Sequence, residues 1–102
     1  MKGTPSITPP KRPRRSLGYD IEWHEKAIED LMGIDKGMAV RIMERAKSYL
    51  PQDPISLGKP LKGMFKGLYR YRFGDYRIIY AVDRVKKAVR ILRVGHRKEV
   101  YE

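Results

Sequence analysis

Residues 68–82 constrain the fold more than any other segment, because two kinds of side chain alternate along them around a central turn signal. In the first half, the aromatic positions are Tyr69, Tyr71 and Phe73, and the basic positions between them are Arg70 and Arg72. Alternate side chains of a strand point to opposite faces, so this pattern predicts one aromatic face and one arginine face. Gly74 and Asp75 form a tight-turn signal, and residues 76–82 are expected to return as the second strand of a hairpin.

The segments on either side of this hairpin predict a mixed fold. Residues 19–23 alternate apolar and acidic side chains as a short strand, and the helical spacing of residues 24–32 ends at Gly33. A second helix is expected from its N-cap Asp35 to Leu50, where Pro51 stops it, and a last strand over residues 89–95. This order predicts an α+β fold, β-α-α-β-β-β, with the two N-terminal helices packed on one face of a mainly antiparallel four-stranded sheet.

Composition limits the classes of protein to which the chain can belong. Its 102 residues suffice for one domain, and the lack of cysteine excludes disulfides, iron–sulfur clusters and cysteine-bound zinc. With two histidines and few clustered carboxylates no metal site is expected, and no apolar run approaches the length of a membrane span. We therefore expect a cytoplasmic protein with no membrane association and no cofactor.

The net charge of +11 favours a polyanionic partner. Residues 1–18 carry five basic residues, four prolines and no acidic residue, and we interpret them as a flexible basic arm beside a folded domain over residues 19–102. Within the domain, residues 20–35 hold six acidic residues against Lys26, whereas residues 59–77 hold six basic residues against Asp75. The sequence thus predicts an acidic helical face and a basic face built from strands.

Arginines on adjacent strands form the strongest candidate site. Arg77 begins the return strand of the hairpin and is expected to share a face with Arg70 and Arg72. The last strand and its exit add Arg93, His96, Arg97 and Tyr101. The plain alternative is that alternating arginines are only the solvated face of a strand, His96 a surface histidine and Tyr101 a packing residue.

The functional interpretation rests on the chemistry of guanidinium groups. They stay ionised at any working pH and form paired hydrogen bonds with phosphate oxygens. Several around one phosphate would stabilise the transition state in which an RNA 2′-hydroxyl attacks the adjacent phosphodiester, a step that needs no metal. A nearby tyrosine or histidine could accept the proton.

Three strings of the sequence resemble the RelE/ParE superfamily of small bacterial toxins, and RelE more than ParE. They are YDIEWHEKAIEDL (19–31), GLYRYRFGDYRIIYAVD (67–83) and ILRVGHRKEVYE (91–102). The resemblance implies the toxin of a type II toxin–antitoxin system, a ribosome-dependent endoribonuclease whose partners are a cognate antitoxin, the ribosome and mRNA. It implies catalytic roles for Arg70, Arg72, Arg77, Arg97 and Tyr101. The RNA- or ribosome-binding residues are expected to be Lys59, Lys62, Lys66, Arg93 and His96.

One feature of the matched residues bears on the mechanism. Both strand positions that are lysine or arginine in RelE-like toxins, Arg70 and Arg72, are arginine here, and arginine is a poor proton donor. His96 or water would then have to protonate the leaving 5′-oxygen. Two alternatives stay open: a ParE-like toxin that inhibits DNA gyrase without cleaving RNA, and a non-catalytic RelE-fold protein that binds nucleic acid or a partner.

Overall fold

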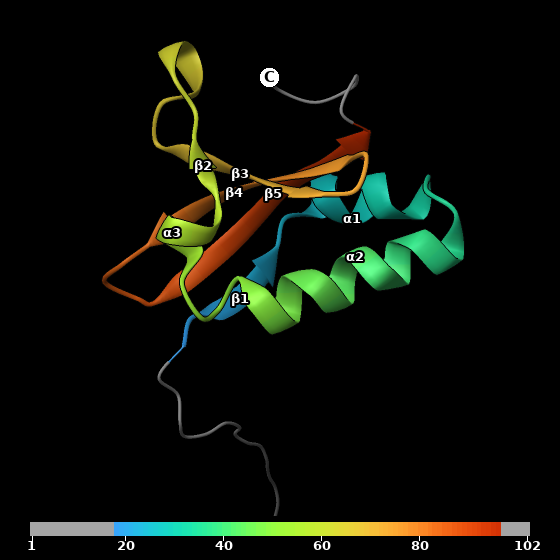
Figure 1. Cartoon of the computed structure of the whole chain (residues 1–102), viewed down its shortest axis with the longest axis horizontal. Coiled ribbons are helices and arrows are strands. Elements are labelled where there is room, and N and C mark those ends of the chain that lie inside the picture. Colours follow the sequence, from blue (N-terminus) through green and yellow to red (C-terminus); the bar gives the residue numbers. More distant parts are fainter. Residues whose placement is uncertain (1–17, 97–102) are drawn as a thin grey trace, which may run out of the picture.

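The computed structural model describes residues 18–96, which form a five-stranded sheet with two long helices on one of its faces (Figure 1). The elements in chain order are β1 (Asp20–Trp23), α1 (Glu25–Met32), α2 (Lys36–Tyr49), α3 (Pro54–Leu57), β2 (Lys59–Pro60), the 3-10 turn η1 (Gly63–Phe65), β3 (Leu68–Phe73), β4 (Tyr76–Asp83) and β5 (Ala88–His96). The expected basic arm, apart from Gly18, and the candidate residues Arg97 and Tyr101 lie outside the described residues.

The strands lie in the order β1-β5-β4-β3-β2, so the first and last strands of the chain are neighbours. They run parallel, with Asp20 opposite Ala88, and the other strand pairs are antiparallel. The α+β fold and the β3–β4 hairpin are confirmed, but the sheet has five strands and not four. The additional strand, β2, has two residues and includes Pro60, so it shows no alternation and carries a residue that strands disfavour.

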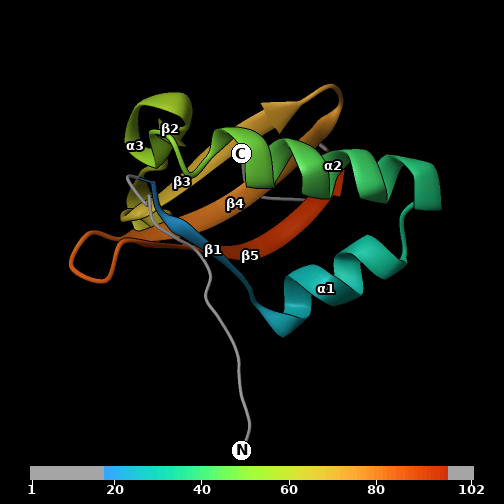
Figure 2. The same cartoon turned by 90° about the horizontal axis from the view of Figure 1, so that it is seen from below.

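The helices α1 and α2 lie beside the sheet (Figure 2), and apolar residues at helical spacing pack them against it. Asp35 begins α2 as expected, because its side chain accepts a hydrogen bond of 3.2 Å from the backbone N–H of Met38. The buried residues of the two helices are Ala27 and Leu31 in α1, and Ala39, Ile42 and Ala46 in α2. They contact Ile78, Tyr80, Val89 and Ile91 of the sheet, so one face of β4 and β5 forms the core.

The aromatic stripe of β3 packs against this same core, as its alternation predicts. Tyr69 stacks on Tyr80 with ring centroids 5.6 Å apart. The Tyr80 hydroxyl donates a buried hydrogen bond of 2.6 Å to the carbonyl oxygen of Pro54, and burial raises the pKa of Tyr80 above its ordinary value. Through this bond Tyr80 fixes the short helix α3, and with it the start of β2, against the sheet.

An acidic residue of α1 holds the end of β5. Beyond Ile91, where β1 ends, the Asp30 carboxylate accepts hydrogen bonds from Arg93 Nε at 2.9 Å, Arg93 Nη2 at 3.1 Å and the Val94 backbone N–H at 2.9 Å. Burial by itself raises the pKa of Asp30. The hydrogen bonds from Arg93 and from the Val94 backbone, and the positive charges of Arg93 and Lys26, lower it by more, so the pKa lies below 3.8.

This depressed pKa predicts an acid-dependent loss of stability. Ionised Asp30 stabilises the fold fully above its unfolded pKa near 3.8, and the contribution disappears as the pH falls through the lower folded value. We expect Asp30→Asn to lower the free energy of unfolding by about 2 kcal/mol at pH 7, and by much less once the pH has fallen below the pKa of Asp30 in the folded protein. Urea unfolding of the wild type and of Asp30→Asn at several pH values measures the difference in their free energies of unfolding. A difference that stays constant with pH would contradict the role of the ionised carboxylate.

Candidate nucleic-acid interface on the open face of the sheet

Three of the predicted arginines lie on the sheet face opposite the helices, called here the open face. Arg72 stands directly opposite Arg77 in the β3–β4 register, and Arg70 lies two positions back along β3. Their neighbours Tyr71 and Phe73 pack on the helical core, so the pleat of the strand directs the arginines the other way. The hairpin therefore brings these three guanidinium-bearing residues onto one surface.

The short strand β2 adds a lysine to this surface. Lys59 stands opposite Arg70 in the antiparallel β2–β3 pair. A shallow cavity of about 190 Å³ lies here, lined by Leu57, Lys59, Arg70, Tyr71 and Arg72. Three of its five lining residues are cations and none is acidic, which suits a phosphate group.

Arg77 is buried, although the alternation of the hairpin suggests an exposed strand face. Only 6% of its surface is accessible, and its Nε and Nη1 atoms are buried. β4 is an inner strand of the sheet, so Arg77 has neighbours on both sides, Arg72 on β3 and Gly95 on β5. Burying a cation costs free energy unless other groups compensate it, and buried charged groups are found most often at functional sites.

The facing arginines give the hairpin a local electrostatic cost. Like charges directly opposite each other on antiparallel strands destabilise the pair, and Arg72 and Arg77 are such a pair. An anion bound between them would remove that repulsion.

We expect Arg72→Thr to stabilise the protein by about 0.5 kcal/mol, because it removes the repulsion and places a β-branched residue in the strand. Inorganic phosphate should raise the melting temperature of the wild type and have little effect on the variant. The control is Arg90→Thr on the same face. Arg90 forms an ion pair with Glu22 at 3.4 Å, so removing its side chain should not stabilise the protein. Thermal unfolding followed by circular dichroism measures the melting temperature of each protein with and without phosphate. A lower melting temperature for Arg72→Thr than for the wild type would contradict the expected repulsion between Arg72 and Arg77.

Two other predicted RNA-binding residues do not join this surface. The guanidinium of Arg93 is held by Asp30 of α1 at the edge of β5. His96 stands opposite Tyr76, whose ring packs against the helical core, and the two rings meet edge to face at 5.7 Å. His96 therefore points to the helix side, where it lines a cavity of about 460 Å³ with Glu29, Asp30 and Asp35. Because Gly95 occupies the position opposite Arg77, the next residue falls on the other face.

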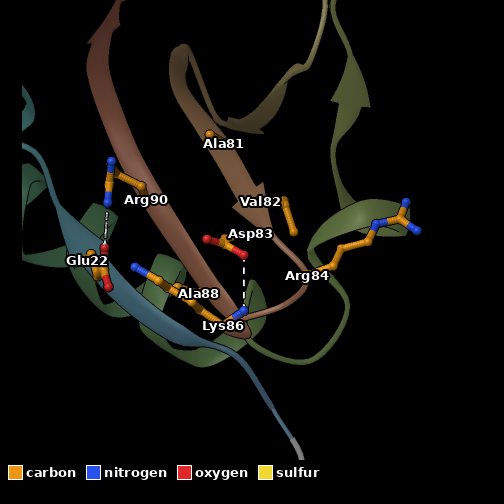
Figure 3. A pocket seen from close by; sticks show the side chains of 8 residues that line it. All are labelled: Glu22, Ala81, Val82, Asp83, Arg84, Lys86, Ala88 and Arg90. Carbon is orange, nitrogen blue, oxygen red and sulfur yellow. Dashed lines mark hydrogen bonds and ion pairs between the residues drawn. The ribbon is translucent and has the colours of Figure 1, made fainter.

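At its other end the open face carries charges of both signs. At the β4–β5 turn a cavity of about 360 Å³ has both signs of charge, with acidic Glu22 and Asp83 beside Arg84, Lys86 and Arg90 (Figure 3). The Asp83 carboxylate accepts hydrogen bonds from the backbone N–H groups of Val85 and Lys86 there. Acidic residues therefore interrupt the basic strand face at this end of the sheet.

Within residues 18–96, no three histidine or carboxylate side chains are grouped so that they could hold a metal ion. No helix in that range is long and apolar enough to cross a membrane. Sequence reasoning missed the role of Asp30, which lies 63 residues from Arg93, and no local pattern signals such a distant contact. The last two expected catalytic residues, Arg97 and Tyr101, lie outside the described part of the chain.

Comparisons with known proteins agree with this architecture. The sequence model of the family described as the ParE toxin of type II toxin–antitoxin systems, parDE, matches residues 21–101. Two toxins of Mycobacterium tuberculosis are 32% identical to this chain: RelG over 83% of this chain and 98% of its own length, and RelE over 81% and 86%.

Solved structures show the same fold. The RelBE2 toxin–antitoxin complex of Mycobacterium tuberculosis contains a chain that matches with a TM-score of 0.76 and 31% identity, over 78% of this chain and 99% of that one. The isolated RelE toxin of E. coli matches with a TM-score of 0.62 at 21% identity, over 76% of this chain and 83% of that one. Sequence family, relatives and fold thus lead to one assignment: the chain belongs to the ParE toxin family of the RelE/ParE superfamily and is a type II toxin–antitoxin toxin.

Proposed function

We propose that the protein is a ribosome-dependent endoribonuclease that cleaves mRNA and so inhibits translation. The observation that carries the proposal is the pair of facing residues Arg72 and Arg77, with Arg70 and Lys59 beside them on the open face. Its two relatives from Mycobacterium tuberculosis are the toxins RelE and RelG, which favours the RelE type of activity. A surface that only binds a protein has no need for so many cations around one point.

The proposed reaction uses the RNA itself as nucleophile. The 2′-hydroxyl of one nucleotide gives its proton to a base, the role that we propose for Tyr101, as its oxygen attacks the neighbouring phosphorus. A P–O2′ bond forms and the P–O5′ bond breaks. The products are a 2′,3′-cyclic phosphate and a free 5′-hydroxyl. Arg72 and Arg77 would stabilise the additional negative charge on the phosphate oxygens in the transition state, with no metal ion taking part.

The leaving 5′-oxygen needs a proton, and the arrangement of the described residues changes the expected donor. Arginine holds its proton too tightly for this role. His96 points to the opposite side of the sheet, which disfavours the hypothesis that it donates. Lys59 lines the same cavity as Arg70 and Arg72, so we propose Lys59, or a water molecule held beside it, as the proton donor.

The proposal includes a cognate antitoxin. The matching chains from Mycobacterium tuberculosis and from Pyrococcus horikoshii both come from RelB–RelE complexes, at 31% and 26% identity. We propose that this toxin acts in the cytoplasm and that a partner of the same kind neutralises it there.

The test is induced expression in a bacterial host, followed by primer extension on an abundant translated mRNA. We expect cuts within translated reading frames, and 3′ ends that resist ligation until acid opens the cyclic phosphate and a phosphatase removes the resulting monoester. Growth arrest with intact mRNA would overturn the proposal and make DNA gyrase the next target to assay. Cuts in untranslated RNA at equal frequency would contradict dependence on the ribosome.

A further inference from the structure

A loop between β2 and β3 extends beyond the sheet and away from the helices (Figure 1). This loop, residues 62–67, is called here the basic loop, and it contains the turn η1. It carries Lys62 and Lys66, both exposed, and lies in the middle of residues 54–74, which contain no acidic residue. Its charge is therefore not neutralised by neighbours in the sequence.

The described contacts hold this loop in one shape. At its base Leu61 is buried, and its backbone N–H donates to the carbonyl oxygen of Leu68 at 2.9 Å. Within it, the N–H of Phe65 donates to the Lys62 carbonyl oxygen at 3.2 Å, and Phe65 is half-buried. Gly67 has φ of +100°, a left-handed backbone that few other residues adopt, so the return to β3 depends on glycine.

The tip of the loop presents a large apolar side chain to solvent. Met64 is 88% exposed, between the two lysines. Exposed methionine is unfavourable in water and gains free energy when it is covered, because apolar surface leaves water. An apolar side chain flanked by lysines can contact the faces of unstacked bases while the lysines contact phosphates, as in proteins that insert apolar wedges between bases.

A second exposed apolar residue provides a comparison within the same molecule. Val85 is 94% exposed at the β4–β5 turn and also has basic neighbours in the sequence. There, however, Asp83 accepts hydrogen bonds from the backbone of the turn, and Glu22 lines the adjacent cavity. These carboxylates partly offset the basic residues of the turn, whereas no acidic residue lies within residues 54–74, so the basic loop suits a polyanion better than the turn does.

We propose that the basic loop is a second RNA-binding element, separate from the arginine site, in which Lys62 and Lys66 contact phosphates and Met64 packs on the bases of structured RNA. The choice of ribosomal RNA as that partner rests on the proposed function. The strand β2 connects the two elements directly, because Lys59 lines the arginine cavity and the loop begins two residues after Pro60.

The test measures binding of the full-length protein to purified bacterial ribosomes by sedimentation at several salt concentrations. We expect Met64→Ala to weaken binding about tenfold without changing its dependence on salt, because a methionine contact releases no counterions. The double variant Lys62→Ala/Lys66→Ala should weaken binding and reduce the slope of log affinity against log salt by about 2. The matched control, Val85→Ala, should bind as the wild type does, and all variants should melt at the wild-type temperature.

Each outcome decides one of the two proposals. Equal binding by Met64→Ala and Val85→Ala would overturn the role of the loop, even if the wild type cleaves mRNA on the ribosome. Weaker binding by Met64→Ala, with mRNA left intact by the bound wild type, would keep the loop and overturn the nuclease proposal. Anionic lipid vesicles are the second arm: Met64-dependent binding to vesicles, with Met64-independent binding to ribosomes, would assign the loop to a membrane surface instead.

Discussion

Arg77→Met is expected to reduce ribosome-dependent mRNA cleavage by about 10²–10³-fold while leaving the fold intact. Removing one donor that stabilises transition-state charge typically costs that much in rate. Methionine has a similar length and is apolar, and replacing a buried charge by an apolar side chain of similar volume is often neutral or stabilising. The measurement is the single-turnover cleavage rate on programmed ribosomes, together with thermal unfolding of the same preparation.

The matched control is Arg84→Met, which removes one arginine from the far end of the open face. Arg84 is exposed and points away from the other residues of its cavity (Figure 3), so cleavage should be unchanged. Arg77→Met should still bind the cognate antitoxin, because the substitution leaves the surface elsewhere as it is. Cleavage at the wild-type rate by the Arg77→Met protein would remove Arg77 from the site.

Gly58→Ala is expected to be strongly destabilising, by about 3 kcal/mol. A Cβ atom at position 58 would collide with the Tyr80 hydroxyl and lie 2.9 Å from its Cζ atom, and 3.2 Å from the backbone oxygen of Arg70. Tyr80 is fully buried and cannot move aside without breaking its hydrogen bond to Pro54. Urea denaturation measures the loss.

A second substitution tests this explanation. Tyr80→Phe alone should cost about 1 kcal/mol, because the Pro54 carbonyl loses its donor. In the Gly58→Ala background the same change should instead restore part of the stability, since it removes the hydroxyl with which the new methyl collides. Purely additive losses in the double variant would mean that the clash with Tyr80 is not the cause.

The hairpin and the shared face of its arginines could be predicted from the sequence because both follow from local alternation. Side chains at Arg70 and Arg72 are two residues apart on one strand, and a two-residue turn fixes where Arg77 falls opposite them. The helix boundaries were likewise predictable, since Asp35 and Pro51 act on the backbone beside them. The α+β fold class follows because the helices and the sheet each have an apolar face, and each buries that face by packing against the other.

The remaining features depend on contacts between distant parts of the chain. Strand β2 exists because two residues reach the edge of β3, and the burial of Arg77 results from its place on an inner strand. The ion pair of Arg93 with Asp30 joins β5 to α1 across 63 residues of sequence. His96 is different, because counting alternate positions back from it to the core residue Val94 would have placed it on the helix side.

The pairing of β1 with β5 has a consequence for how this toxin is made. Residues 20–23 pair with residues 88–91, so the sheet cannot close until residues 88–91 have been synthesised. Such distant pairing is slow to form, because the whole intervening chain must be ordered first. The last residues of β5 are among those that complete the sheet on which the arginines converge. The surface that carries the arginines is therefore assembled late in synthesis, and a chain that stops short of residue 88 cannot present it.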